Sequence, residues 1–207
     1  MEGLVAGDKP DAGAIVRRHL AASREIVATT LADEGIVAAM AAIAQRMEQT
    51  LRAGGKILLA GNGGSAADAQ HISGELLSRL MFDRTPLPSI ALTADQAVLT
   101  AIGNDYGYEH VFARQVRGLG RKGDVFIAIS TSGRSPNILK AVEAAKDLGL
   151  HTIAFTGNGN APLAGMCDLV LRVPSQVTPL IQQVYMAAAH AICEYVEAAL
   201  FGTGSRP

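Results

Sequence analysis

The chain has 207 residues and a mass of 21.5 kDa, which fits one α/β domain, since domains cluster at about 100 to 150 residues and often reach about 250. Its 18 Lys and Arg residues nearly balance its 19 Asp and Glu residues, so the formal net charge is -1 and no summed field attracts nucleic acid or an anionic membrane surface. Alanine, the best helix former, supplies 35 residues of the 49% hydrophobic fraction. This composition argues against a general DNA- or RNA-binding protein.

The amino terminus, MEGLVAGDKPDAG, contains neither a basic segment nor an apolar run and therefore predicts no secretory signal. The most apolar stretches, residues 35–44 and 184–193, are about ten residues long, well short of the roughly 18 to 20 that a membrane-spanning helix needs. Cys167 and Cys193 stand alone and match neither a disulfide framework nor a zinc-binding spacing. We therefore expect a cytoplasmic protein with no membrane partner.

Residues 14–53 carry apolar side chains at helical spacing, interrupted at residues 33–35, and predict a helical hairpin. The pattern then changes to short apolar runs bounded by turn residues, which predict buried strands at 56–60, 89–93, 124–129, 151–155 and 168–173. Further helices are predicted at 65–80, 95–102, 108–118, 136–148 and about 175–200. This alternation is typical of one α/β domain over residues 1–207, a parallel sheet with helices on both faces and flexible ends at 1–13 and 202–207.

Two unusual loops leave the first and third predicted strands. For five parallel strands with right-handed crossovers we expect the order 2-1-3-4-5, in which ligands bind between the ends of those two strands. The loops GNGGS (61–65) and STSGRS (130–135) each open a helix, so backbone N–H groups and hydroxyls face the crevice. This chemistry suits a phosphate monoester, although the glycines would equally serve as tight-turn residues.

The helix predicted after the first loop carries His71 and Glu75, four residues apart on one face, where they can converge on one metal or one substrate. A polar pair on a solvated surface is the alternative. The final helix offers Gln182 and His190, which share a side of it but lie roughly 12 Å apart along its axis. A histidine among so many apolar neighbours is also explained as a satisfied core residue.

Polar residues elsewhere are less decisive. Asn104 and Asp105 lie in a predicted turn, where they could reach the hydroxyls of a sugar or simply form the turn. Asp68 and Arg79 share the predicted helix of His71 and could assist it, but nothing in their spacing separates them from solvated charges.

Four motifs in chain order, GNGGSAADAQH, AIGNDYG, AISTSGRSPN and IQQ followed by His190, resemble the sugar-isomerase (SIS) domain family, and within it the isomerases of seven-carbon sugar phosphates. The resemblance covers roughly residues 14–200. It implies a flavodoxin-like five-stranded parallel sheet, with the N-terminal hairpin and the long C-terminal helix building a homotetramer whose active sites lie at subunit interfaces. The chain departs from the family at Ala66, at Ala67 and in the extension before residue 14, away from the implied chemistry.

The resemblance also implies an activity, a metal and a set of site residues. The activity is conversion of sedoheptulose 7-phosphate into D-glycero-D-manno-heptose 7-phosphate, the first step of nucleotide-heptose and lipopolysaccharide-core synthesis. The metal is Zn2+, one per subunit, with ligands expected at His71, Glu75, Gln182 and His190. Contacts to phosphate and sugar are expected at Asn62, Gly63, Gly64, Ser65, Glu75, Asn104, Asp105, Ser130, Thr131, Ser132, Ser135 and Gln182.

Such a reaction moves hydrogen between C1 and C2 of a keto sugar through an enediol or enediolate, which needs a base, an acid and charge stabilisation. We assign His190 as the base at C1 and Glu75 as its partner at C2, with zinc as a Lewis acid. Both side chains are also expected metal ligands, so the two roles compete for the same atoms.

Three alternatives stay open at this point. A non-catalytic SIS-domain scaffold that binds the bacterial replication initiator shares parts of these motifs, but it lacks the acidic and histidine positions that Glu75 and His190 occupy here. A dinucleotide-binding oxidoreductase would explain GNGGSA, yet Asp83 and Asp95 are poorly placed for its acidic residue. SIS relatives acting on glucosamine or N-acetylmuramic acid phosphates would share the phosphate loops.

Overall fold

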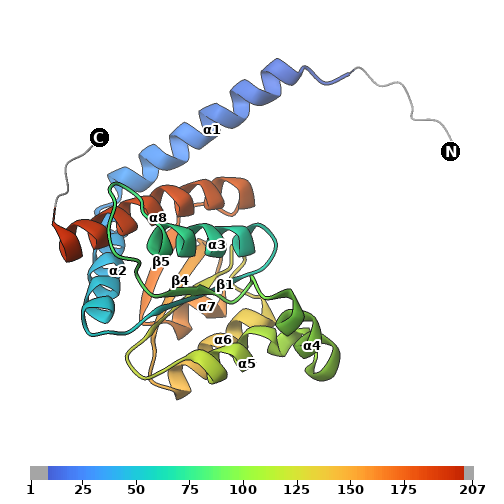
Figure 1. Ribbon diagram of the computed structural model, residues 1–207. Coiled ribbons are helices and arrows are strands. Elements are labelled where there is room, and N and C mark those ends of the chain that lie inside the picture. Colours follow the sequence, from blue (N-terminus) through green and yellow to red (C-terminus); the bar gives the residue numbers. More distant parts are fainter. Residues whose placement is uncertain (1–8, 203–207) are drawn as a thin grey trace, which may run out of the picture.

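Five parallel strands form the central sheet of the protein, which a computed structural model describes over residues 9–202 (Figure 1). The strands are β1 (Ile57–Gly61), β2 (Ser89–Ala91), β3 (Val125–Ile129), β4 (His151–Gly157) and β5 (Leu169–Val173). Their order in the sheet is β2-β1-β3-β4-β5, and every neighbouring pair is parallel. The predicted fold class and strand order are therefore confirmed.

Helices cover both faces of this sheet (Figure 1). One face carries α2 (Glu34–Arg52), α3 (Gly64–Leu77) and α8 (Thr178–Phe201); the other carries α4 (Gln96–Tyr106), α5 (Val111–Leu119), α6 (Pro136–Asp147) and α7 (Pro162–Met166). Because successive side chains of a strand point to opposite faces, β1 feeds two cores. Ile57 and Leu59 belong to the core under α8, whereas Leu58 and Ala60 belong to the core under α5 and α6.

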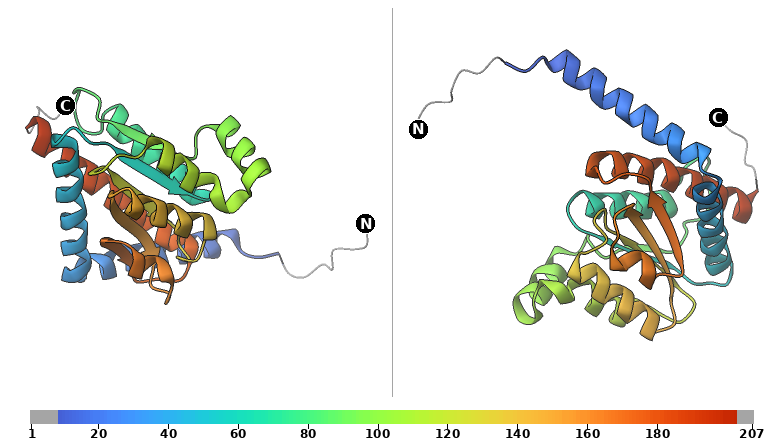
Figure 2. Two further views of the ribbon diagram at one scale, coloured as in Figure 1. Left: turned by 90° about the horizontal axis from the view of Figure 1, so that it is seen from below. Right: turned by 180° about the vertical axis from the view of Figure 1, so that it is seen from behind.

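The first helix, α1 (Ala12–Ala32), projects from the body of the molecule (Figures 1 and 2). Asp33 ends it and caps α2 by accepting the N–H groups of Gly35 and Ile36, and the two helices meet at a bend of 79°. Asp11 caps the start of α1, so residues 12 and 13 are helical although we expected flexibility there. Of the predicted flexible ends, residues 1–8 and 203–207 lie outside the described residues.

Two local expectations were wrong. Asn104 and Asp105 lie in the last turn of α4 rather than in a turn after it, because Asp95 caps the helix and it continues to Gly107, whose φ of 88° ends it. The chain also forms α7, which the sequence did not predict, since five residues are too few to show a helical period. A one-turn 3-10 helix, Tyr108–His110, precedes α5.

The apolar character of the last helix extends beyond the ten-residue stretch 184–193. By length and composition alone α8 could cross a membrane, as could α1 and α2 if the bent pair were one span. Nine residues of α8 are buried, however, and it packs against α2 and α3 in one of the two cores. This is the environment of a core helix in a soluble fold.

Candidate active site

The two glycine- and serine-containing loops lie side by side, because they leave the adjacent strands β1 and β3. Gly63 caps the start of α3 with a φ of 56°, a conformation that favours glycine. The side chain of Asn62 exchanges two hydrogen bonds of 2.9 Å with Asn137 at the start of α6, and its Oδ1 also accepts from the hydroxyl of Tyr108 at 3.0 Å. The first loop is thereby tied to the helix that follows the second.

The second loop, residues 130–135, is held by its own hydroxyls. Ser130 Oγ lies 3.2 Å from Ser135 Oγ and accepts the Gly133 N–H at 3.1 Å, and Ser132 Oγ accepts the Arg134 N–H at 3.3 Å. Ser135 is the N-cap residue of α6, but its side chain makes no capping hydrogen bond. The loop thus gathers hydroxyl groups at a helix N-terminus, an arrangement that suits an anion.

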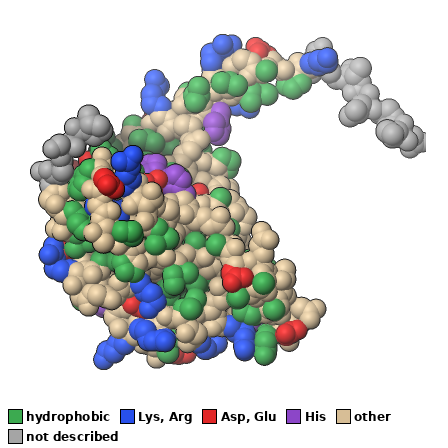
Figure 3. Space-filling view, in the orientation of Figure 1, with side chains coloured by type: hydrophobic (Ala, Val, Ile, Leu, Met, Phe, Trp, Pro, Cys, Tyr) green, Lys and Arg blue, Asp and Glu red, His purple; other side chains and the backbone are tan. Residues whose placement is uncertain are grey.

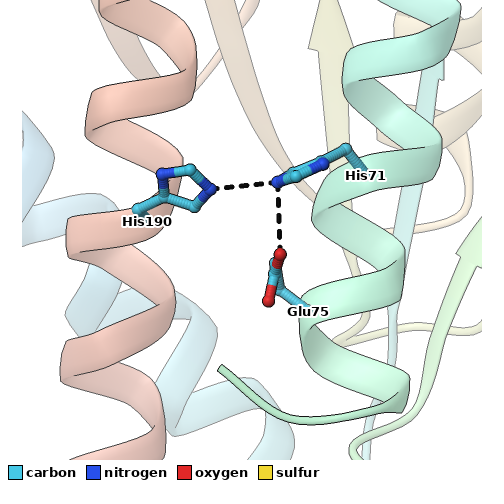
Figure 4. Close-up of side chains that lie close together, drawn as sticks. All are labelled: His71, Glu75 and His190. Atoms are coloured by element: carbon cyan, nitrogen blue, oxygen red, sulfur yellow. Dashed lines mark hydrogen bonds and ion pairs between the residues drawn. The ribbon is translucent and has the colours of Figure 1, made fainter. Parts of the chain in front are cut away.

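Three potential metal ligands converge between α3 and α8 (Figure 4). His71 Nε2 lies 2.9 Å from His190 Nε2 and 3.2 Å from Glu75 Oε1, and one ligand atom from each residue falls within 4.8 Å of the others. The His71 side chain is 47% exposed and that of Glu75 is 20% exposed, so the cluster opens to solvent. Imidazole nitrogens with a carboxylate oxygen form a donor set that zinc accepts.

Gln182 of α8 lies beside the first turns of α3 and bonds to Asp68. Its Nε2 donates to Asp68 Oδ2 at 3.2 Å, and it lies so close to Gly64 that a Cβ there would overlap the amide. Burial raises the pKa of the Asp68 carboxyl, against the opposing effects of the Gln182 hydrogen bond and the nearby His71. With its nitrogen facing Asp68, the Gln182 amide oxygen is the atom left for another ligand.

Comparison with known proteins places this chain in a family. Residues 18–157 match the SIS domain. The chain is 51% identical to the phosphoheptose isomerase of Burkholderia pseudomallei strain 1710b over 187 residues, 90% of this chain and 95% of that protein. It is 52% identical to the phosphoheptose isomerase of Bradyrhizobium sp. strain BTAi1 over 186 residues, 90% and 94% of the two chains. The chain belongs to the phosphoheptose isomerases of the SIS domain family.

A solved structure agrees with this SIS assignment. Phosphoheptose isomerase GmhA from Neisseria gonorrhoeae matches with a TM-score of 0.85 and 41% identity, covering 91% of this chain and all of that one. The fold and family implied by the sequence motifs are therefore confirmed.

In the described part of the chain, two expected site residues of this SIS domain lie on α4 without a hydrogen bond to the rest of the candidate site. Asn104 and Asp105 are exposed on α4, where Asn104 Nδ2 donates to Asp105 Oδ1 at 2.8 Å. Within residues 9–202, no hydrogen bond links either of them to the phosphate loops or to His71. Asp105 instead helps to line a groove beside the edge strand β2. Their proposed contact with the sugar stays a prediction.

Sequence reasoning missed or undervalued several residues around this SIS site. Asn137 and Tyr108 hold Asn62, and only the close pairing of the two loops in space reveals them. Asp68 is three residues before His71, a spacing that places it on the same side of α3, but its role depends on Gln182 from a distant helix. Arg79, by contrast, is exposed on the segment after α3.

Proposed function

We propose that this protein is an aldose–ketose isomerase that converts sedoheptulose 7-phosphate into D-glycero-D-manno-heptose 7-phosphate. The observation that carries the proposal is the convergence of His71, Glu75 and His190 in a chain about half identical to proteins named phosphoheptose isomerase. The cluster supplies imidazole and carboxylate groups, and the loops that leave β1 and β3 supply donors for a phosphate.

The phosphate group is assigned to the loops. Ser130, Thr131, Ser132 and Ser135 would donate hydroxyl or backbone hydrogen bonds to it, with the backbone at residues 62–65 closing the other side. Because the side-chain amide of Asn62 is already engaged by Asn137, we assign substrate contact at this position to its backbone. This leaves the sugar carbons free to extend toward the helical cluster.

Zinc is the metal that fits the cluster best, because its usual protein ligands are imidazole, thiolate and carboxylate groups. We assign His71, Glu75 and His190 as ligands and the Gln182 amide oxygen as the fourth, with one Zn2+ per subunit. Bound there, the ion would act as a Lewis acid toward the sugar oxygens.

Proton transfer is assigned to His190 and Glu75. His190, with its ring nitrogen free of metal in this step, would take the proton from C1 of the ketose. The O1 hydroxyl proton would pass to O2 of the enediolate, and Glu75 would deliver a proton to C2, which together convert the ketose into the aldose. The carboxylate of Glu75 has two oxygens, of which Oε1 lies 3.2 Å from His71 Nε2. The second oxygen allows this residue to hold a ligand position and still exchange a proton.

We further propose a homotetramer that acts in the cytoplasm, at the first step of nucleotide-heptose and lipopolysaccharide-core synthesis. Apolar side chains line the projecting helix (Figure 3), where Val16, Leu20 and Leu31 are 56%, 62% and 72% exposed. Apolar surface of this kind on a projecting helix is suited to burial against other subunits. The replication-initiator scaffold gains no support, since the relatives compared above are named as isomerases.

The proposal is tested by incubating purified protein with sedoheptulose 7-phosphate in deuterated water, with and without chelator, and following both sugars by NMR. Glu75→Gln and His190→Gln keep a polar side chain but remove the acid–base group, so each variant should remain folded and lose about 10² to 10⁴ in turnover. Wild type should incorporate deuterium, and the variant lacking the base should not. A wild-type protein without turnover would refute the function, and a variant with near-full activity would remove that residue from the mechanism.

A further inference from the structure

The helix that carries His71 and Glu75 ends without a glycine cap. Ser78 follows α3 with φ -95° and ψ -107°, and the last carbonyl groups of a helix have no partners within it. Arg84 supplies those partners from the following loop: Nη2 donates to the Glu75 carbonyl at 2.7 Å, and Nη1 donates to the carbonyls of Leu76 at 2.8 Å and Ser78 at 3.2 Å. Its positive charge also suits the negative end of the helix dipole.

The same guanidinium is anchored to α8. Arg84 Nε donates to Glu197 Oε1 at 2.9 Å, and Glu197 accepts the backbone N–H groups of Leu80 at 3.2 Å and Met81 at 2.8 Å. The side chains of Arg84 and Glu197 are 2% and 1% exposed. The pair is therefore a buried and hydrogen-bonded connection between the end of α3 and α8.

This connection lies next to the site, yet neither charged group belongs to the ligand set. Glu197 follows His190 by seven residues, two helical turns on the same side of α8 and about 10 Å along it. At the other helix, Arg84 binds the backbone carbonyl of Glu75 itself. Three polar links thus hold the two helices together: Asp68 with Gln182, His71 with His190, and, through the loop after α3, Arg84 with Glu197.

We propose that Arg84 and Glu197 are positioning residues for the isomerase site, which set the place of Glu75 relative to His190 by holding the end of α3 against α8. The activity part of this inference rests on the proposed isomerase activity, whereas the metal-binding part rests only on the proposed zinc ligands. Groups that orient metal ligands typically change metal affinity or activity by about 10- to 100-fold when they are replaced. Misplacement of a reacting group by about 1 Å can cost about 10²-fold in rate.

The experiment uses two variants of the full chain. Arg84→Lys keeps the charge opposite Glu197 but cannot reach Glu197 and several carbonyl groups with one compact ammonium group. Arg84→Met combined with Glu197→Gln removes both charges together, which avoids an unpaired buried charge, and glutamine still accepts an N–H group. The measurements are Zn2+ affinity by competition with a chromophoric chelator, the absorption spectrum with Co2+, the kcat and KM for sedoheptulose 7-phosphate, and the melting temperature.

Both variants should bind Zn2+ about 10- to 100-fold more weakly and lose a similar factor in kcat, with an altered Co2+ spectrum. The KM should change much less than kcat, because the phosphate loops are untouched. Asp124→Asn is the matched control: this carboxylate is also buried, pairs with Lys56 and accepts two backbone N–H groups, but its partners, Lys56 and Arg121, belong neither to α3 and α8 nor to the loop that carries Arg84. It should lower stability and leave Zn2+ affinity and kcat unchanged.

Folded Arg84→Lys protein with wild-type Zn2+ affinity and kcat would overturn the proposal, and this variant decides the matter if the double variant fails to fold. An equal loss of Zn2+ affinity in Asp124→Asn, at an equal loss of stability, would also overturn it, since general destabilisation would then explain the effect. A wild-type protein that binds Zn2+ but does not isomerise the sugar would refute the proposed function alone, and the Zn2+ affinities would still decide the role of Arg84.

Discussion

Replacing Gly64 by alanine tests whether the position of Gln182 depends on a missing side chain. Gly64 is the first residue of α3, and its φ is not positive, so the backbone accepts alanine there. The new Cβ would overlap the Gln182 amide, which is the far end of a flexible side chain. We therefore expect α3 to stay in place and Gln182 to move, breaking its 3.2 Å hydrogen bond to Asp68.

Two opposing effects set the size of the change. Alanine in place of glycine favours a helix by up to about 1 kcal/mol. Loss of a hydrogen bond to a charged group costs about 1.5 to 3 kcal/mol, and the half-buried setting of this pair places it toward the lower end. The free energy of unfolding should therefore fall by about 1 kcal/mol, which lowers the melting temperature by about 2 to 4 °C in a domain of this size.

Gly74→Ala on the same helix is the control, because an added Cβ at Gly74 has no neighbour within 4 Å. This variant should gain about 0.5 to 1 kcal/mol and keep the wild-type site. Denaturant unfolding gives the stabilities, and chelator competition should show Zn2+ affinity about 10- to 100-fold weaker in Gly64→Ala only. If Gly64→Ala gains stability as Gly74→Ala does and binds Zn2+ like wild type, the close approach does not position Gln182 and the reasoning is refuted.

Two further predictions concern the phosphate loop and the pH dependence of stability. Ser132→Ala should raise the KM for the sugar phosphate by about 10-fold through loss of one charge-assisted hydrogen bond and leave Zn2+ affinity unchanged; equal losses in both would contradict the phosphate assignment. Burial pushes the pKa of Asp168 up, but hydrogen bonds from the Thr152 amide at 2.8 Å and hydroxyl at 2.9 Å outweigh it, and the pKa lies below its ordinary value. The carboxylate therefore stabilises the fold above the unfolded pKa of about 3.9, and this contribution disappears as pH falls through the lower folded pKa. Asp168→Asn should be less stable than wild type at neutral pH, with a difference that shrinks in acid, and a difference that does not vary with pH in unfolding titrations would count against this account.

The sheet was predictable because each strand carries its own local signal. Val125–Ile129, for example, is a continuous apolar run between turn residues, as a strand covered on both faces must be. The extent of α4 was less accessible, since Gly103 and Asn104 weaken the helical pattern that its capping residue Asp95 and the terminal Gly107 support. Local signals therefore identified elements better than their ends.

The candidate site was also predictable only in part from the sequence. His71 and Glu75 could be paired from their spacing alone, because four residues in a helix always return to one face. The contact of His71 with His190 could not, since 119 residues separate them and only the packing of α3 on α8 joins them. The link from Arg84 to Glu197 is hidden for the same reason, as each charge taken singly resembles a solvated surface residue.

That separation of 119 residues also has a consequence for biosynthesis. At about 5 to 20 residues per second, a ribosome needs on the order of 6 to 24 s to reach His190 after it has added His71. During that interval the nascent chain carries only the His71 and Glu75 half of the cluster, and the full donor set forms when α8 docks on α3. An ion held by all three residues would select the finished fold over the growing chain, so that metal loading and completion of the fold become one event.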